Sequence, residues 1–221
     1  MPQPFVQSSY QVRFEWGVAG LARLEPADVV VVVDVLRFSS TVVDAAASGR
    51  SVNLADAVGW SRNGAAVVSA AAASVSEVVL VGALRNAAAV ARTVLEIQNR
   101  RQARTSVAVI AAGELTDAGE LRFAVEDLLG AGAIIAALSD LGADHTSPEA
   151  AAACESARGL RRALRHLLTA SGSGRELADG VGATARIEAA GLVPTGAEAA
   201  AEIDAVDVVP VLVDGMLVPF E

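Results

Sequence analysis

A carboxylate, a guanidinium and three hydroxyl groups lie close together in one short segment of this sequence. Asp34 directly follows five consecutive valines, Val29 to Val33, and Arg37 stands three residues later. Ser39, Ser40 and Thr41 come next. A continuous β-branched run has no polar face, so we expect a strand that is buried on both sides and ends near Asp34. A carboxylate and a guanidinium at a strand end suit binding of a metal–phosphate or another anion.

The three hydroxyl residues stand where a helix should begin. The first turn of a helix leaves backbone N–H groups without partners, and Ser or Thr side chains commonly cap them. The same N–H groups also bind phosphate. Capping and anion binding are therefore compatible interpretations of Ser39, Ser40 and Thr41, and both stay open.

Asp34 and Arg37 also have two interpretations. They could form an ordinary ion pair at the strand end, or Asp34 could bind a metal while Arg37 holds a phosphate. A charge placed directly after five valines costs free energy unless it is paired or liganded.

Three further carboxylates are candidates for the same site. Glu114 follows the strand expected at 106–112, so it should share a sheet edge with Asp34 if the two strands are parallel. Glu126 and Asp127 lie near the start of the next expected helix, where acids also stabilise the helix dipole. Several carboxylates at one edge suit a hard cation, because such ions take oxygen ligands.

Other polar residues have weaker signals. Asn63-Gly64 is typical of a tight turn, and a site loop is the alternative. Asn86 is more typical of a helix cap than of a substrate contact. Ser173 and Arg175 belong to a glycine–serine segment, 171–174 with the arginine after it, which is either a flexible linker or an anion-binding loop.

Composition excludes several classes of function. The net charge of −9 argues against a nucleic-acid or anionic-membrane partner, which needs a basic surface. The sequence contains no lysine, so Schiff-base chemistry and a P-loop lysine are excluded. One cysteine and no basic–apolar leader predict a cytoplasmic protein. The apolar stretch 65–84 is rich in Ala and Ser, which indicates core segments rather than a membrane span.

Periodicity predicts alternating strands and helices. We expect strands at 11–16, 28–35, 51–54, 65–69, 76–81, 106–112, 208–213 and 216–220. We expect helices at 19–24, 39–47, 86–101, 123–138 and 147–169, with one or two more within 176–203. Loops are expected at 56–64, 113–121 and 171–174. The pattern predicts one α/β domain over 1–221, layered α/β/α, with a mixed, largely parallel sheet.

Segments spread over most of the chain resemble the 2-phosphosulfolactate phosphatase (ComB-like) family. They are VVVVVDVLRFSST at 29–41, RNGA at 62–65, VGALRNAAAVA at 81–91, VIAAGE at 109–114, VEDLLGAGAII at 125–135, SGSGREL at 171–177 and EIDAVDVVPVLVDG at 202–215. The chain departs from the family pattern in the middle. Only 51–61 stands where members carry a longer glycine-rich segment, and the hydroxyl-rich NG motif is reduced to Ser61–Ala65.

The resemblance implies a Mg²⁺-dependent phosphatase that hydrolyses a small acidic phosphate monoester. Asp34 and Arg37 are then the expected catalytic residues, and Asp34, Glu114, Glu126 and Asp127 the expected metal ligands. The expected phosphate or substrate contacts are Ser39, Ser40, Thr41, Asn63, Gly64, Asn86, Ser173 and Arg175. The nucleophile is either Asp34 or a metal-activated water. A homodimer is a further expectation, and a non-catalytic anion-binding or scaffold relative is the competing hypothesis.

Overall fold

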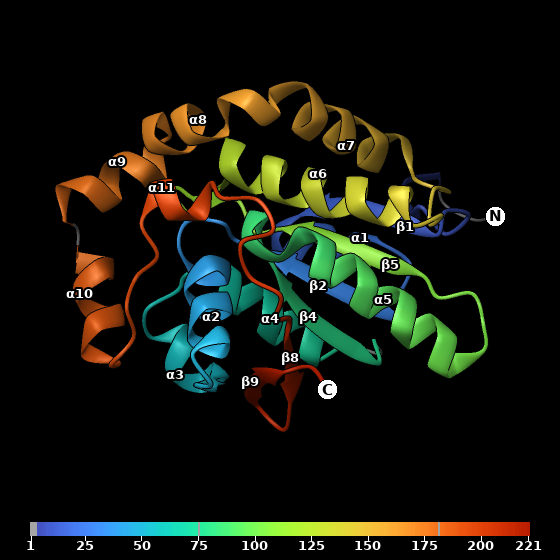
Figure 1. Ribbon diagram of the computed structural model, residues 1–221, viewed down its shortest axis with the longest axis horizontal. Coiled ribbons are helices and arrows are strands. Elements are labelled where there is room, and N and C mark those ends of the chain that lie inside the picture. The colour runs from blue at the N-terminus through green and yellow to red at the C-terminus, as the bar shows by residue number, and fades with distance from the viewer. Residues whose placement is uncertain (1–3, 75, 181) are drawn as a thin grey trace.

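The computed structural model describes residues 4–74, 76–180 and 182–221, and its centre is a mixed β-sheet (Figure 1). Seven strands hydrogen-bond in the order β1-β5-β2-β4-β8-β9-β3. Their bounds are β1 Val12–Trp16, β2 Val29–Val33, β3 Val52–Asn53, β4 Val78–Gly82, β5 Val107–Ala111, β8 Pro210–Val213 and β9 Met216–Pro219. Two further strands, β6 Glu114–Leu115 and β7 Leu121–Arg122, pair with each other as a separate hairpin.

The central strands β1, β5, β2 and β4 are parallel, whereas β8, β9 and β3 pair antiparallel at one side of the sheet. Val33, the last residue of β2, lies opposite both Gly82 of β4 and Ala111 of β5. The segments that follow these three strands therefore leave the sheet at the same carboxyl edge, which is where ligands bind in open α/β sheets.

Helices cover both faces of the sheet (Figure 1). Valines 29, 31 and 33 of β2 pack in a core with the helices α5 (Ala87–Arg101) and α6 (Val125–Asp140). Valines 30 and 32 pack on the opposite face with α2 (Phe38–Ala47) and α4 (Gly64–Ala72). The α-helices are α1 Gly17–Arg23, α2 Phe38–Ala47, α3 Leu54–Val58, α4 Gly64–Ala72, α5 Ala87–Arg101, α6 Val125–Asp140, α7 Pro148–Leu160, α8 Leu164–Ala170, α9 Gly172–Asp179, α10 Gly182–Ala189 and α11 Ala197–Ala200. Short 3₁₀ helices are η1 Pro4–Val6, η2 Leu84–Asn86 and η3 Arg161–Ala163.

The expected α/β class, with helices on both faces of a mostly parallel sheet, is confirmed. The structure adds a further helical layer, because α7 and α8 arch over the outside of α6 (Figure 1). The α6–α7 contact is very close: a Cβ added to Gly132 would lie 2.1 Å from the carbonyl oxygen of Ala153. Only glycine permits that approach.

Five local expectations were wrong. The loop expected at 113–121 contains β6 and the first residue of β7, which pair as a hairpin. The strand expected at 65–69 is the helix α4, since an alanine-rich apolar run fits a buried helix as well as a buried strand. The loop expected at 56–64 begins inside α3, which Asn53 caps by accepting hydrogen bonds from Ala55 N and Asp56 N.

The other two concern the later helices. The single helix expected at 147–169 is divided by η3 into α7 and α8. The loop expected at 171–174 is the first turn of α9, where the Ser171 hydroxyl accepts a hydrogen bond of 3.1 Å from Gly174 N. In both α3 and α9, short polar or glycine residues start a helix rather than interrupt one.

No helix among the described residues combines the length and apolar character needed to cross a membrane. The stretch 65–84 divides into α4 and β4, both part of the core.

Candidate active site

A cavity of about 550 Å³ opens at the carboxyl edge of the parallel strands. It is bounded by the segment after β2, the segment between α3 and α4, the β6–β7 hairpin, and the helices α9 and α10. Its charged and polar lining comprises Asp34, Arg37, Trp60, Ser61, Arg62, Asn63, Glu114, Thr116, Asp117, Arg122, Glu176 and Arg186. Acids and arginines from segments far apart in the chain therefore meet in one hollow.

Asp34 lies at the base of this site and is held by backbone groups. Its Oδ2 accepts a hydrogen bond of 2.8 Å from Gly64 N, and its Oδ1 accepts a longer one of 3.4 Å from Phe38 N. Gly64 must be glycine for this contact, because an added Cβ would lie 2.6 Å from Asp34 Oδ2. The Asn63-Gly64 pair therefore does more than form a turn.

The pKa of Asp34 is raised to about 7, mainly by burial and also by the nearby carboxylates of Glu114 and Glu126, although the hydrogen bonds from Gly64 and Phe38 oppose the rise. A buried carboxylate next to other acids is stabilised by any cation that binds among them. A carboxyl group that titrates near neutral pH is a typical functional-site feature.

Arg37 supplies a cation that is ready for an anion. Its Nη1 atom is buried and lacks a hydrogen-bond partner among the described residues. Arg62, Arg122 and Arg186 line the same cavity. None of these four arginines forms an ion pair within the described part of the chain, whereas most of the other arginines pair with an acid. The cavity thus has guanidinium groups free for a ligand.

Glu114 and Asn63 face each other across the cavity wall. The Asn63 amide nitrogen donates a hydrogen bond of 2.9 Å to Glu114 Oε1, while Asn63 Oδ1 is buried and has no donor among the described residues. Asp34, Glu114 and Asn63 all line the cavity, and their side-chain oxygens are of the type that Mg²⁺ takes together with water. Within the described ranges, however, no three His, Cys, Asp or Glu side chains form a metal-binding cluster.

The three hydroxyl residues at the start of α2 turn away from the cavity. Ser39 Oγ accepts a hydrogen bond from Asp34 N, Ser40 Oγ donates to Val35 O, and Thr41 Oγ1 accepts from Thr195 N. The first helical N–H groups are also engaged, since Asp34 accepts from both Phe38 N and Ser39 N. These hydroxyl groups are therefore used in hydrogen bonds within the protein that hold the segment around Asp34 and the start of α2.

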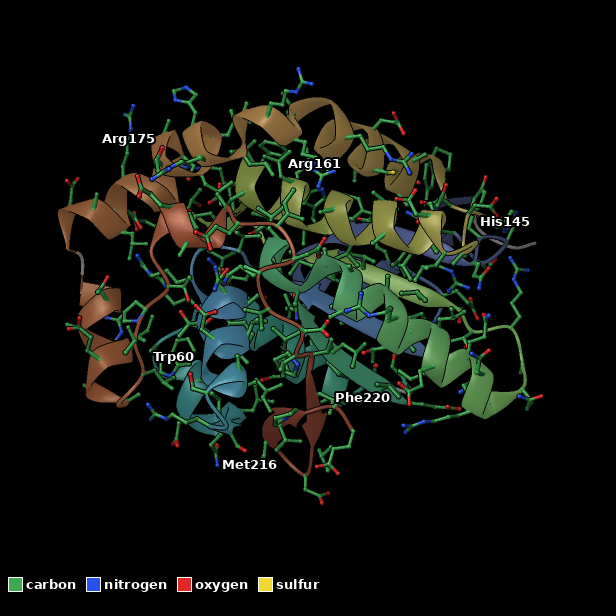
Figure 2. All side chains as sticks on the ribbon, viewed as in Figure 1. Trp60, His145, Arg161, Arg175, Met216 and Phe220 are labelled. Atoms are coloured by element: carbon green, nitrogen blue, oxygen red, sulfur yellow. The ribbon has the colours of Figure 1, made fainter. Side chains whose placement is uncertain are left out.

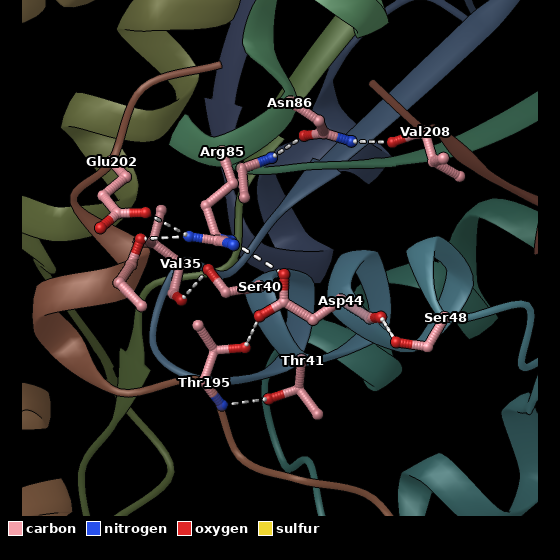
Figure 3. A network of polar contacts seen from close by, with 12 residues as sticks. Val35, Ser40, Thr41, Asp44, Ser48, Arg85, Asn86, Thr195, Glu202 and Val208 are labelled. Atoms are coloured by element: carbon pink, nitrogen blue, oxygen red, sulfur yellow. Dashed lines mark hydrogen bonds and ion pairs between the residues drawn. The ribbon is translucent and has the colours of Figure 1, made fainter. Parts of the chain in front are cut away.

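Thr41 belongs to a polar network that holds the C-terminal part of the chain against α2 (Figure 3). Asp44 accepts hydrogen bonds from Thr195 Oγ1, at 2.6 Å, and from Arg85 Nε, at 2.9 Å. Arg85 also donates to the carbonyl of Ala199. Asn86, next in the chain, is fully buried and bonds to Ala83 N and to the carbonyl oxygen of Val208. Asn86 stands at the N-cap position of α5, but its side chain makes no capping hydrogen bond to that helix, so the cap interpretation was wrong in its contact. The side chain instead joins segments of the interior, away from the cavity.

The two acids of α6 lie beneath the site rather than in it. Asp127 accepts hydrogen bonds from Val35 N at 2.7 Å and Gly113 N at 3.0 Å, which fastens the segments after β2 and β5 to each other. Burial raises its pKa well above the ordinary range, and the charges of Asp34 and Glu126 add to this. Neither acid lines the cavity.

The glycine–serine segment is divided between two environments. Ser173 is buried and its hydroxyl donates a hydrogen bond to Glu126 Oε1. Arg175 is exposed and points away from the body of the molecule (Figure 2). The cavity instead receives Arg122 and Arg186, which carried no motif signal, and Arg62 and Trp60, which stand close to Asn63 in the sequence.

Comparison with known proteins assigns the chain to a family. A family model described as 2-phosphosulpholactate phosphatase matches residues 48–215 of the 221-residue chain. No curated protein matches the sequence. The matched range contains Asn63, Glu114 and the cavity arginines 62, 122 and 186, but begins after Asp34 and Arg37. Because most of the chain is covered, this protein belongs to the 2-phosphosulpholactate phosphatase family.

Proposed function

We propose that this chain is a Mg²⁺-dependent phosphatase that hydrolyses a small acidic phosphate monoester in the cavity at the carboxyl edge of β2 and β5. The observation that carries the proposal is that Asp34, Glu114 and Asn63 line the same cavity as Arg37, whose Nη1 atom is buried and without a partner among the described residues. Membership of a phosphatase family supports the reaction class.

Asp34, Glu114 and the Asn63 oxygen would hold the metal ion. When bound, Mg²⁺ supplies positive charge that stabilises the transferring phosphoryl group and its leaving oxygen. Asp34 is already fixed by Gly64 N, so it needs little reorganisation to act as a ligand.

The arginines bind and orient the substrate. Arg37, the most enclosed of them, donates to the phosphoryl oxygens, and its bonds strengthen as negative charge develops there. Arg62, Arg122 and Arg186 are exposed at the rim and attract an anionic substrate. The chain as a whole carries a net charge of −9, so the gathering of arginines distinguishes the cavity from the rest of the protein.

One observation favours the alternative of a non-catalytic anion-binding relative. Within the described residues, the acids that were expected to share the metal are divided, with Glu126 and Asp127 beneath the cavity and bonded to protein groups. Such a protein would keep the Arg37 anion site without a working metal site.

The experiment that tests the proposal is phosphate release from a panel of phosphomonoesters, with and without Mg²⁺. We compare wild type with Glu114→Gln, and we use Glu120→Gln as control, because Glu120 lies in the same hairpin but outside the cavity. Glu114→Gln should raise the Mg²⁺ concentration needed for half-maximal activity at least tenfold, since one anionic ligand is lost. Absence of Mg²⁺-dependent turnover in wild type on every substrate, with phosphate still bound, supports the non-catalytic alternative.

A further inference from the structure

Unpartnered buried polar atoms are concentrated in the candidate active site. Among the described residues, the buried side-chain atoms without a hydrogen-bond partner are Arg37 Nη1, Trp60 Nε1, Asn63 Oδ1, Arg101 Nε and Thr184 Oγ1. The first three belong to residues that line the one cavity. A buried polar group without a partner costs free energy, and such groups gathered at one place commonly mark the place of a ligand.

Trp60 is the one of the three that no sequence motif indicates. Its side chain is 5% exposed, and its ring packs against Phe38 with centroids 5.6 Å apart. Phe38 in turn follows Arg37 and bonds to Asp34 through its backbone N–H. The indole is therefore fastened to the segment that carries both expected catalytic residues, and it lies beside α3 in Figure 2.

The chemistry of the three atoms is complementary to an oxyanion and its counter-ion. Arg37 Nη1 and Trp60 Nε1 are donors, whereas Asn63 Oδ1 is an acceptor that suits a cation. An indole N–H can only donate, so the group that satisfies Trp60 must carry an acceptor oxygen or similar atom. We propose that Trp60 Nε1 donates a hydrogen bond to an oxygen of the anion held by Arg37, which makes Trp60 a substrate-binding residue.

The indole also borders a second hollow, which Trp60 and Arg186 share with the cavity. The other residues of that hollow include Arg50, whose guanidinium already bonds to the carbonyl of Gly191. Arg37 and Asn63, which carry the other two unpartnered atoms, line the cavity and do not line the second hollow. The anion in the cavity is therefore the assigned acceptor. This inference rests on the proposed function and adds a specific contact to it.

The test uses inorganic phosphate as the probe and the wild-type protein labelled with ¹⁵N. The chain has two tryptophans, Trp16 and Trp60, so its spectrum shows two indole N–H resonances, which the Trp16→Phe variant assigns. Phosphate binding, measured in parallel by calorimetry, should shift the Trp60 indole proton downfield and leave that of Trp16 in place, because Trp16 lies outside the cavity. A Trp60 resonance that stays unchanged in phosphate-saturated protein overturns the inference.

The matched variant is Trp60→Phe, which keeps an aromatic ring against Phe38 and removes the N–H donor together with part of the ring. Loss of one hydrogen bond to a charged group should weaken phosphate binding about tenfold, while Trp16→Phe leaves it unchanged. Unchanged affinity in a folded Trp60→Phe protein overturns the inference and leaves the proposed function intact. Failure of wild type both to bind phosphate and to turn over any monoester overturns the two together.

Discussion

The two ends of strand β2 carry the same residue type in opposite circumstances. Asp28 precedes the valine run and Asp34 follows it. Asp28 is fully bonded: its Oδ2 accepts from Ser106 N and Ser106 Oγ, both at 2.7 Å, and its Oδ1 from Arg101, also at 2.7 Å. Asp34 receives backbone hydrogen bonds but no arginine, although Arg37 is three residues away.

The pKa values of the two carboxyl groups differ accordingly. Burial alone would raise the pKa of Asp28, but the Ser106 hydrogen bonds together with the Arg101 and Arg13 charges outweigh burial and lower it. Burial raises the pKa of Asp34 to about 7, with help from neighbouring acids. The carboxylate at the amino edge of the strand thus has cationic and hydrogen-bonding partners within the protein. The carboxylate at the carboxyl edge has no cationic partner among the described residues, so a bound cation would stabilise it.

The largest expected effect is loss of phosphatase activity in Asp34→Asn. The change removes the carboxylate that we propose as a metal ligand while keeping its shape, so kcat should fall about 10³-fold in a phosphate-release assay. Asp28→Asn, at the other end of the same strand, should retain wild-type kcat. Equal losses of kcat in the two variants would contradict the view that only the carboxyl edge of β2 carries the active site.

Arg37→Gln should have the next largest effect. Removing the enclosed guanidinium should reduce kcat/KM about 10²-fold, because the charged contact to the phosphoryl group is lost. Thermal stability should hardly change, since Arg37 makes no ion pair among the described residues. The control is Arg175→Gln, an exposed arginine outside the cavity, and a loss of activity there equal to that of Arg37→Gln would argue against the assignment.

Gly64→Ala tests the backbone contact that fixes Asp34. The new methyl group would lie 2.6 Å from Asp34 Oδ2, so we expect a destabilisation of about 1–3 kcal/mol together with reduced activity. Gly159→Ala in α7 is the matched control, because a Cβ there meets no atom within 4 Å. It should stabilise the protein by up to about 1 kcal/mol in urea unfolding. If Gly64→Ala changed neither stability nor activity, the backbone around Gly64 would be able to move away from Asp34 at little cost.

The last expected effects are in the pH dependence of stability without Mg²⁺, which changes no chemical step. Because the pKa of Asp34 rises from 3.8 to about 7 on folding, the folded state binds more protons in this window, and stability falls as pH rises through it. Asp34→Asn should reduce that fall.

The pH dependence expected from Asp28 is the reverse. Because folding lowers the pKa of Asp28, its ionised carboxylate stabilises the folded state above the ordinary carboxyl pKa range, and this stabilisation is lost as pH falls. Asp28→Asn should therefore lower the free energy of unfolding by about 1–2 kcal/mol at neutral pH, as measured by urea unfolding. The variant should also lose less stability than wild type as pH falls.

The sequence by itself determined the α/β class and most of the parallel core. Unbroken runs of β-branched valine have no polar face, so they indicated buried strands, and the periodic segments between them indicated covering helices. It also indicated Asp34, Arg37, Asn63, Gly64 and Glu114, all of which the structure brings to one edge. These residues directly follow strands or adjoin tight turns, which are local signals.

Tertiary structure alone decided which other charges join them. Arg122 comes from a hairpin and Arg186 from a helix more than sixty residues later, and neither stands in a recognisable pattern. Glu126, Asp127 and Ser173 carry the right chemistry but bond to each other or to backbone N–H groups, so they support the site from beneath. Whether a polar side chain is consumed by the fold or left for a ligand depends on partners distant in the chain. Spacing along one strand or helix does not specify those partners, and only packing of the whole chain supplies them.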